Sequence, residues 1–179
     1  RLQGQAQLHF SDELPRVAIF VSKQSHCLLD LLWRARSGEL PMQVPLVISN
    51  HRVLEPLCAD FGVAFTHVPV SAESKPDAEA QMLALLAEHQ IYLAVLAKYM
   101  HVLSVDFLSR FPDVINIHHS FLPAFKVAQP YHRAWERGVK LIGATAHYVT
   151  EDLDDGPIIE QTIAHVSHRD EVEDLIRRG

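Results

Sequence analysis

The chain has 179 residues, of which 48% are hydrophobic and 21% are charged, and its formal net charge is −6. This length and composition suit one folded α/β domain and exclude a disordered chain. The acidic balance excludes a general nucleic-acid surface, which needs clustered Lys and Arg, and no apolar run approaches the roughly 20 residues of a membrane span. Only two cysteines are present, Cys27 and Cys58, so a disulfide scaffold is excluded and we expect a cytoplasmic protein.

The two ends of the chain differ from its middle. Residues 1–15 are polar and show no sustained period, so we interpret them as a linker, and the chain starts at Arg1 without a methionine. Residues 170–178 begin a charged amphipathic helix pattern that stops at Gly179. We therefore expect residues 16–179 to be one folded domain, truncated at its C-terminus, within a fragment of a larger protein.

Strand and helix patterns alternate along the middle of the chain. Continuous apolar, β-branched runs predict buried strands, and apolar residues at helical spacing predict helices. In chain order the expected elements are strand 17–22, helix 28–36, strand 44–49, helix 53–61, strand 64–68, helix 76–89, strand 92–97, helix 105–110, strand 114–118, helix 131–136, strand 143–149 and strand 157–163. This alternation predicts a Rossmann-like α/β fold, a mostly parallel sheet with helices on both faces.

Single residues mark several of the expected boundaries. Gly38, Gly62 and Gly138 follow helical patterns and fit as helix stops, and Ser104 fits as the N-cap of helix 105–110. Pro45 interrupts the second strand, so we expect that strand to lie near an edge of the sheet or to start late.

Ligands of open α/β sheets bind beyond the carboxyl ends of the strands, here in the loops after residues 22, 97, 118 and 149. The loop after the first strand, residues 22–26, reads SKQSH and has no glycine. It is neither a G-x-G-x-x-G turn nor a Walker loop, whose glycines let a phosphate approach the backbone closely. This argues against dinucleotide and ATP chemistry.

Among these loops, polar side chains suited to chemistry are most concentrated in the segment 116–123, NIHHSFLP. Alternate side chains of a strand share a face, so Asn116 and His118 point the same way at the carboxyl end of strand 114–118. The amide can donate a hydrogen bond to an oxyanion and the imidazole can carry a proton near neutral pH, which suits a carbonyl substrate. The alternative is structural: Asn116 ends the strand, and His118 is a core histidine with satisfied hydrogen bonds.

Four carboxylates cluster in the loop 149–157, VTEDLDDGP. Such a loop is usually a solvated turn. Here we expect the strand before it to run in the same direction as strand 114–118, so that both loops lie at one edge of the sheet and a carboxylate orients the imidazole. Asn, His and Asp together supply an oxyanion donor, a proton carrier and a base.

The motif NIHHSFLP and the segment 143–159, GATAHYVTEDLDDGPII, resemble the folate-dependent formyltransferase superfamily. More narrowly, they resemble its hydrolase members, the formyltetrahydrofolate deformylases, over roughly residues 16–179. The resemblance implies the formyltransferase fold and an upstream regulatory, ACT-like domain. It also implies catalytic roles for Asn116, His118 and Asp154.

The same resemblance implies which residues bind the substrate. Residues 96–104, LAKYMHVLS, resemble the loop that encloses the pterin ring. The expected substrate contacts are Lys98, Tyr99, Met100, His101, Val102, Leu103, His119, Lys126, Thr150, Glu151 and Asp152. Backbone groups hold the pterin ring, and Lys98 and Lys126 attract the carboxylates of the folate tail. His147 is either a packed histidine bonded to backbone or a supporting residue behind Asp154.

Three departures from the superfamily bear on the reaction. His119 stands where the transferases of purine synthesis have proline, and residues 22–26 replace their glycine-rich phosphate loop. Both favour water over a phosphorylated amine as the acceptor. Val127 stands where the superfamily usually has glycine, which predicts a reshaped outer wall of the site.

The implied function is hydrolysis of 10-formyltetrahydrofolate to formate and tetrahydrofolate, which supplies formate and free folate for one-carbon and purine metabolism. No metal or redox cofactor is expected, and we expect a homo-oligomer. Two alternatives are formyl transfer to an amine acceptor and a folate-binding regulatory module without turnover.

Metal-dependent hydrolysis is a third alternative, with ligands among His118, His119, His132, His147 and Asp154. Against it, the adjacent His118 and His119 point to opposite faces of the sheet, so at most one of them joins such a site. No H-x-x-x-H or C-x-x-C spacing occurs either.

Overall fold

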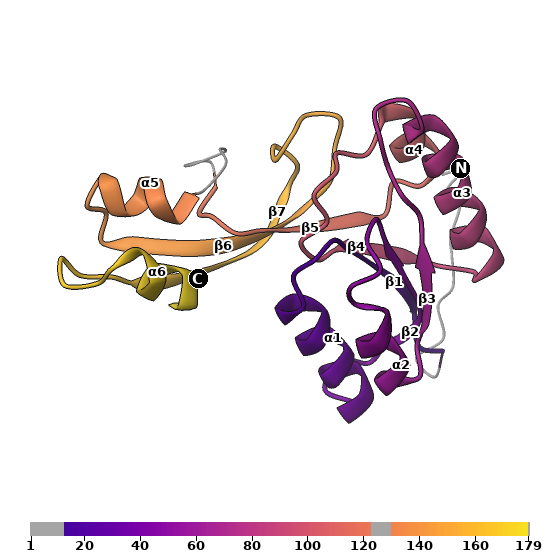
Figure 1. Ribbon diagram of the computed structural model, residues 1–179, viewed down its shortest axis with the longest axis horizontal. Coiled ribbons are helices and arrows are strands. Elements are labelled where there is room, and N and C mark those ends of the chain that lie inside the picture. The colour runs from indigo at the N-terminus through magenta and orange to yellow at the C-terminus, as the bar shows by residue number, and fades with distance from the viewer. Residues whose placement is uncertain (1–12, 123–129, 179) are drawn as a thin grey trace, which may run out of the picture.

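The protein is built on one seven-stranded sheet. The computed structural model describes residues 13–122 and 130–178, so Lys126 and Val127 lie outside the described residues. The strands are β1 (Arg16–Val21), β2 (Gln43–Ser49), β3 (Ala64–His67), β4 (Leu93–Leu96), β5 (Val114–His118), β6 (Leu141–Tyr148) and β7 (Ile158–His165). Across the sheet they follow the order β3-β2-β1-β4-β5-β6-β7 (Figure 1).

Helices cover both faces of this sheet, as the alternating pattern predicts. They are α1 (His26–Ser37), α2 (Glu55–Phe61), α3 (Lys75–Glu88), α4 (Val105–Arg110), α5 (Pro130–Glu136) and α6 (Val172–Arg178). α1 and α2 pack on one face through residues such as Leu28 and Cys58, and α3 and α4 pack on the other through Met82 and Phe107. α5 and α6 pack on each other and on Ile142 of β6. None of the described helices is long and apolar enough to cross a membrane.

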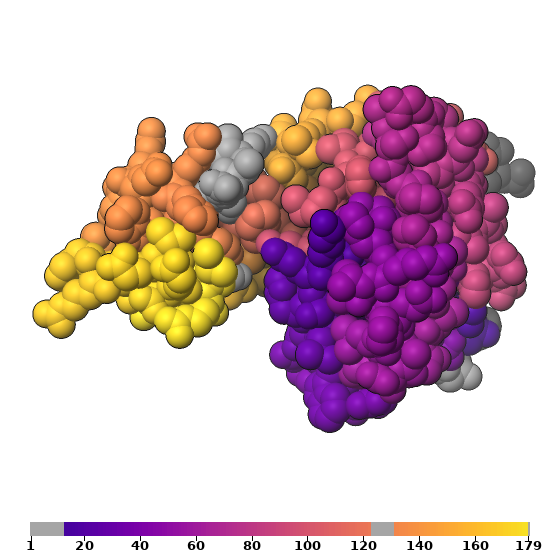
Figure 2. All heavy atoms as spheres, viewed as in Figure 1, coloured from indigo at the N-terminus to yellow at the C-terminus, as the bar shows by residue number. Residues whose placement is uncertain are grey.

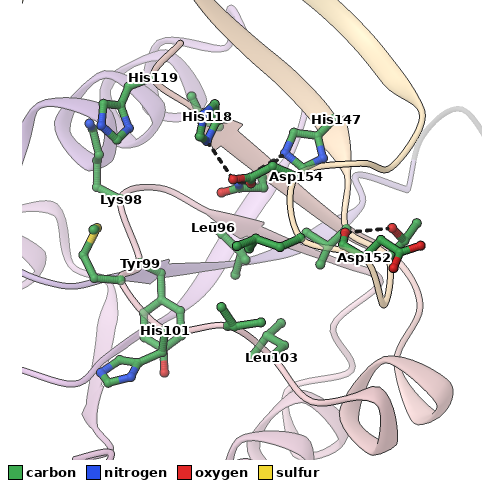
Figure 3. A pocket seen from close by; sticks show the side chains of 17 residues that line it. Leu96, Lys98, Tyr99, His101, Leu103, His118, His119, His147, Asp152 and Asp154 are labelled. Carbon is green, nitrogen blue, oxygen red and sulfur yellow. Dashed lines mark hydrogen bonds and ion pairs between the residues drawn. The ribbon is translucent and has the colours of Figure 1, made fainter. Parts of the chain in front are cut away.

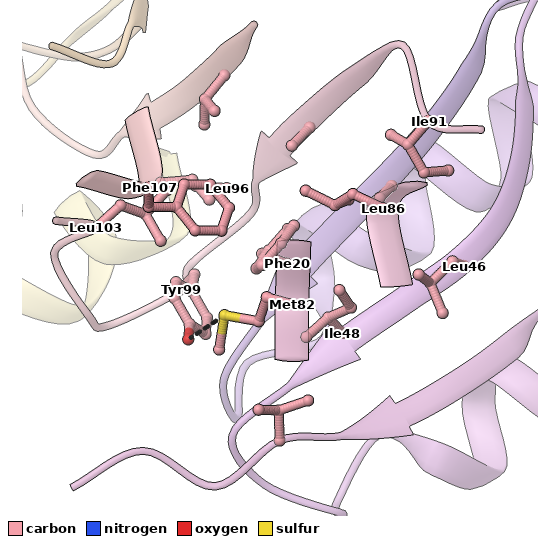
Figure 4. Close-up of a cluster of buried hydrophobic side chains, with 14 of the residues drawn as sticks. Phe20, Leu46, Ile48, Met82, Leu86, Ile91, Leu96, Tyr99, Leu103 and Phe107 are labelled. Atoms are coloured by element: carbon pink, nitrogen blue, oxygen red, sulfur yellow. Dashed lines mark hydrogen bonds between the residues drawn. The ribbon is translucent and has the colours of Figure 1, made fainter. Parts of the chain in front are cut away.

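The core has two apolar layers because alternate residues of β1 point to opposite faces. Ala18 and Phe20 belong to the layer under α3 and α4, and Ile19 and Val21 belong to the layer under α1 and α2. Figure 4 shows the first layer, in which the rings of Phe20 and Tyr99 meet edge to face with centroids 5.5 Å apart. Burying a side chain such as Phe20 contributes roughly 1.5–3 kcal/mol. This layer therefore also holds the loop after β4, where Tyr99 lies.

The boundaries of the elements follow local signals. Gly38, Gly62 and Gly138 have φ values of 78°, 71° and 64°, in the left-handed region that glycine adopts freely. The Ser104 side chain accepts a hydrogen bond from the Phe107 amide at the start of α4. These residues therefore act as the helix stops and the cap that the sequence predicts.

Pro45 is accommodated within β2 by a shift of register. Residues 16–18 of β1 lie opposite residues 43–46 of β2, so one additional residue of β2 bulges out beside the proline. The strand is next to the edge strand β3, as expected for a strand that contains proline.

β1 to β5 are parallel, but β6 and β7 are antiparallel to their neighbours. The expectation that the strand before the acidic loop runs in the same direction as β5 is therefore wrong. Tyr148, at the end of β6, pairs with Ile115 near the start of β5. The alternation of side chains along a strand is the same in both directions, so the sequence pattern could not distinguish a parallel from an antiparallel pairing of this strand with β5.

β6 extends past the carboxyl end of β5. Thr145 pairs with His118, so residues 141–144 lie beyond β5 and carry α5 and α6 away from the rest of the sheet (Figure 1). Figure 2 shows a hollow between the yellow spheres of α6 and the indigo spheres near the start of α1.

Candidate active site

Asp154 joins the polar side chains that the sequence singles out. Its Oδ1 accepts a hydrogen bond from Asn116 Nδ2 over 3.3 Å, and its Oδ2 lies 3.3 Å from His118 Nδ1. Its Oδ1 also lies 3.5 Å from His147 Nε2. The side chains of His118 and Asp154 are only 11% and 12% exposed. Figure 3 shows His118 and His147 pointing at Asp154 from two sides.

The hydrogen bonds assign the ring nitrogens. His147 Nδ1 lies 2.9 Å from the carbonyl oxygen of Tyr148, which can only accept, so this nitrogen carries a hydrogen. In the neutral ring, His147 Nε2 then accepts from Asn116 Nδ2 over 3.3 Å. By the same reasoning His118 Nδ1 donates to Asp154, which makes Nε2 the basic nitrogen of the neutral His118 ring.

The acidic loop reaches these side chains by folding back over the sheet. Because β6 is antiparallel to β5, the loop leaves beside the start of β5, where the Val149 amide donates to the Val114 carbonyl over 2.9 Å. The Tyr148 amide donates to the Pro157 carbonyl over 3.0 Å and closes the base of the loop. The segment between these bonds carries Asp154 to the far end of β5.

Two backbone positions shape this loop. Asp154 has a φ of 52°, in the left-handed region that Asp tolerates better than most residues. A Cβ at Gly156 would lie 1.8 Å from the Tyr148 carbonyl oxygen, so only glycine fits where the loop closes.

A cavity of about 280 Å³ opens beside Asp154. The residues that the sequence predicts and that line it are Lys98, Tyr99, Met100, His101, Val102, Leu103, Asn116, His118, His119, His147, Thr150, Asp152 and Asp154. Of the predicted residues that the structure describes, only Glu151 is not among them, and its side chain is exposed. Leu96, Ile117, Val149 and Leu153 also line the cavity and were not named among the expected substrate contacts, although Leu96 begins the segment 96–104 that resembles the pterin loop. These residues are apolar and lie within or beside the polar motifs, and nothing else in the sequence indicates that they line a cavity.

Hydrogen bonds fasten one end of the cavity wall, residues 97–104, to two neighbouring loops. Ser22 Oγ accepts from the Met100 amide over 3.0 Å and donates to Asn50 Oδ1 over 2.7 Å. Asn50 Nδ2 lies 2.9 Å from His101 Nε2. The loops after β1, β2 and β4 therefore hold one another in place.

Glu79 of α3 fastens the other end of this wall. Its carboxylate accepts hydrogen bonds from the Ser104 amide over 2.9 Å and from the Ser104 hydroxyl. Between the two ends, burial, with the nearby charge of Glu79, raises the pKa of Tyr99, which therefore stays a neutral phenol. The wall is fixed before any ligand arrives.

His119 differs from His118 in its surroundings. Burial, with the charges of Lys98 and His118, lowers the pKa of His119 to about 4. Its ring is therefore neutral near pH 7, and its centroid lies 5.6 Å from that of His118. His119 can exchange hydrogen bonds at this position but carries no charge.

No group of three or more His, Cys, Asp or Glu side chains within residues 13–122 and 130–178 is arranged to hold a metal ion. Cys27 and Cys58 are free thiols. The arrangement around Asp154 is one of hydrogen bonds, with an amide and an imidazole donating to one carboxylate.

Comparison with known proteins places this site in a family. The family model for formyl transferase matches residues 15–179. The chain belongs to the formyl transferase family. The fold and the motif residues therefore agree with the resemblance noted in the sequence.

Curated relatives match along the whole chain. The formyltetrahydrofolate deformylase of Synechocystis sp. is 60% identical over 179 residues, which are 100% of this chain and 63% of the relative. The formyltetrahydrofolate deformylase of Bacillus subtilis is 50% identical over 173 residues, which are 96% of this chain and 58% of the relative. The chain thus spans about three fifths of the length of these relatives.

Solved structures confirm the fold. A formyltetrahydrofolate deformylase from Burkholderia mallei has a TM-score of 0.89 and 50% identity, covering 93% of this chain and 60% of that chain. Glycinamide ribonucleotide transformylase 1 from Symbiobacterium toebii has a TM-score of 0.87 and 35% identity, covering 97% of this chain and 84% of that chain.

Proposed function

We propose that the protein hydrolyses 10-formyltetrahydrofolate to formate and tetrahydrofolate. One observation carries the proposal: the Asp154 carboxylate holds His118 and Asn116 side by side at the edge of a cavity with apolar walls. The 60% identity to a relative named formyltetrahydrofolate deformylase supports the same reaction.

Water is the nucleophile in this proposal. Asp154 orients His118, whose Nε2 takes a proton from the water while the water oxygen adds to the formyl carbon. The formyl oxygen becomes an oxyanion and accepts a hydrogen bond from Asn116 Nδ2. The C–N bond then breaks, its electron pair stays on the folate nitrogen, and that nitrogen is protonated through solvent. His118 Nε2 returns its proton to solvent, and the formic acid that leaves ionises to formate. The mechanism needs no metal or redox cofactor.

Asn116 must release one of its present partners to stabilise the oxyanion. Its amide nitrogen lies 3.3 Å from both Asp154 Oδ1 and His147 Nε2. These are long hydrogen bonds, so exchanging one of them for a bond to a charged oxygen is favourable. His147, which is 2% exposed and held by the Tyr148 carbonyl, then keeps the amide oriented as a supporting residue.

The cavity wall suits the pterin ring of the proposed substrate. Met100, Val102 and Leu153 line the cavity yet are 69%, 55% and 61% exposed, so a bound ring would remove apolar surface from water. Backbone groups of residues 97–104 and 149–155 would supply the polar contacts. The hydrogen bonds of Ser22 and Glu79 preorganise this wall.

Formyl transfer to an amine is the second candidate, because two structural relatives are named as a glycinamide ribonucleotide transformylase and a phosphoribosylglycinamide formyltransferase. Identity to these two is 35% and 31%, against 60% and 50% to two deformylases. The loop after β1, residues 22–26, also has no glycine to bring a phosphate close to the backbone. Both observations favour water as the acceptor.

The deciding experiment supplies 10-formyltetrahydrofolate without any amine and measures formate. Release in proportion to protein, and its loss in Asp154→Asn, supports hydrolysis. Folate binding without formate release supports a binding module. Formylation of an added amine at the expense of formate supports transfer.

A further inference from the structure

A second cavity, of about 790 Å³, shares Lys98, Ile117 and His119 with the first. It lies between residues 23–27 and the residues of α5 and α6, in the hollow visible in Figure 2. β1 and β4 are neighbours in the sheet, and from them the strand order continues in opposite directions, to β2 on one side and β5 on the other. This is the topological switch point of the sheet, where open α/β sheets bind ligands.

The lining of the second cavity is basic although the chain is acidic overall. Lys23, Lys98, Arg177 and Arg178 line it, and within the described part of the chain no Asp or Glu does. The two arginines are paired with the carboxylates of Asp174 and Asp170. Lys23 and Lys98 form no ion pair with any described residue, so their charges remain available to a ligand.

Lys98 occupies an unusual backbone position. Its φ of 61° lies in the left-handed region, which glycine adopts freely and lysine rarely. Its side chain runs toward His119, away from Tyr99 and His101 (Figure 3). Burial lowers the pKa of Lys98, because the ammonium group has lost part of its hydration. A strained residue that carries an unpaired, partly buried charge is expected to have a role in function.

Tyr131 adds an aromatic wall to the same cavity. The residue is 9% exposed, and its hydroxyl has no hydrogen-bond partner among residues 13–122 and 130–178. It lines the second cavity, and its ring centroid lies 6.0 Å from that of His119. The hydroxyl oxygen has almost no accessible surface, so the ring of Tyr131, and not its hydroxyl, forms this part of the cavity wall.

We propose that the second cavity contains a subsite for a small carboxylate at Lys98, beside the rings of His119 and Tyr131, which receives formate as it leaves the catalytic centre. This inference rests on the proposed function, which produces formate beside the Asp154 carboxylate. Like charges repel, so formate is driven away from Asp154 and attracted to the cations of the second cavity. Tetrahydrofolate and formate then leave through different cavities that meet at Lys98 and His119.

Product inhibition tests the subsite in the full-length protein. Initial rates are measured with added sodium formate, and sodium chloride at the same concentration controls for ionic strength. We expect Lys98→Met to raise the inhibition constant of formate about tenfold, because a charge-assisted hydrogen bond is lost. Lys98→Arg keeps the charge and should keep the inhibition. Lys140→Met removes an exposed lysine outside both cavities and serves as the matched control.

Equal formate inhibition constants in wild type and Lys98→Met would overturn the proposal.

Binding without turnover gives a second, independent measurement. Sodium formate is titrated in the absence of folate while the ring signals of His119 are followed by NMR, assigned by their loss in His119→Gln. We expect these signals to shift in wild type and Lys140→Met, and not in Lys98→Met. Sodium phosphate is titrated in parallel, and a shift with phosphate but none with formate overturns the carboxylate assignment.

The two failures are distinguishable because the titration needs no substrate. If the protein releases no formate from 10-formyltetrahydrofolate, the proposed hydrolysis fails, and with it the assignment of the subsite to a product. A formate-dependent shift that requires Lys98 would still establish the carboxylate subsite.

Discussion

His118 Nδ1 lies 3.3 Å from Asp154 Oδ2, although β6, which leads to Asp154, runs antiparallel to β5, which ends at His118. The contact exists because the loop 149–157 folds back along β5 instead of continuing from a parallel strand. The proposed catalytic pair therefore depends on the shape of one loop as much as on the two residues.

Removing the charge of Asp154 should reduce turnover while leaving the fold intact. Asn has nearly the same size as Asp and tolerates the left-handed backbone at this position. Asp154→Asn loses the carboxylate that orients His118 and stabilises its protonated form, so we expect kcat to fall by about 10²-fold or more. Asp113→Asn, at an exposed carboxylate before β5, is the control. Near-normal formate release by folded Asp154→Asn would exclude the assigned role.

Changing Gly156 should displace Asp154 without touching it. In Gly156→Ala the new Cβ would meet the Tyr148 carbonyl oxygen at 1.8 Å, so the loop backbone must move. We expect a loss of about 1–3 kcal/mol in the free energy of unfolding, and a fall in kcat larger than any rise in KM. Gly138→Ala is the matched control, because that glycine has a positive φ but open space around it. Gly138→Ala should lower the free energy of unfolding and leave kcat unchanged. Equal losses of kcat in Gly156→Ala and Gly138→Ala would contradict this account.

Loosening the cavity wall should weaken substrate binding more than turnover. Ser22→Ala removes the acceptor of the Met100 amide and the donor to Asn50. Leaving such buried groups unpaired costs about 1–3 kcal/mol. If the loosened loop of the variant becomes ordered only when substrate binds, this cost corresponds to a rise in KM of about fivefold or more. Steady-state kinetics with the proposed substrate measure it. A fall in kcat at constant KM would show instead that Ser22 positions the reacting groups.

His119 should make the protein less stable in mild acid. Its folded-state pKa near 4 is below the usual value of 6.5, so between these pH values the unfolded chain binds more protons than the folded one. The contribution of His119 to stability is therefore full above pH 6.5 and is lost as the pH falls toward 4. Allowing for solvent screening, we expect it to account for about 1 kcal/mol of the loss between pH 7 and pH 5.

Urea unfolding at pH 7 and pH 5 measures this difference for wild type and His119→Gln. The variant cannot be protonated, so its free energy of unfolding should fall less between the two pH values. Equal falls in both proteins would mean that other groups cause the acid sensitivity.

Exhaustive chelation should leave the proposed activity unchanged. The mechanism assigns proton transfer to His118 and oxyanion stabilisation to Asn116, so it requires no Lewis acid. Formate release is measured before and after dialysis against a strong chelator. Loss of activity that one divalent metal restores would favour the metal-dependent alternative.

The sequence predicted most of the candidate site but not its whole surface. The polar residues of the site could be identified by residue type, at positions such as Asn116 and His118 among the last residues of a buried strand, at its carboxyl end. Ile117 could not be found in this way, because an apolar strand residue has the same sequence pattern whether it faces the core or a cavity. Glu151 was expected in the site because it belongs to the acidic loop, but the loop turns its side chain to solvent.

Local features were determined by the sequence itself, because they depend on neighbours a few residues away. The helix ends at Gly38 and Gly62, the cap at Ser104, and the shared face of Asn116 and His118 all belong to this class. Direction and distance between remote segments were decided only by the tertiary structure. A strand pattern is the same in both directions, so the antiparallel course of β6 depends on its pairing with β5, and the meeting of Asp154 with His118 depends on that pairing in turn.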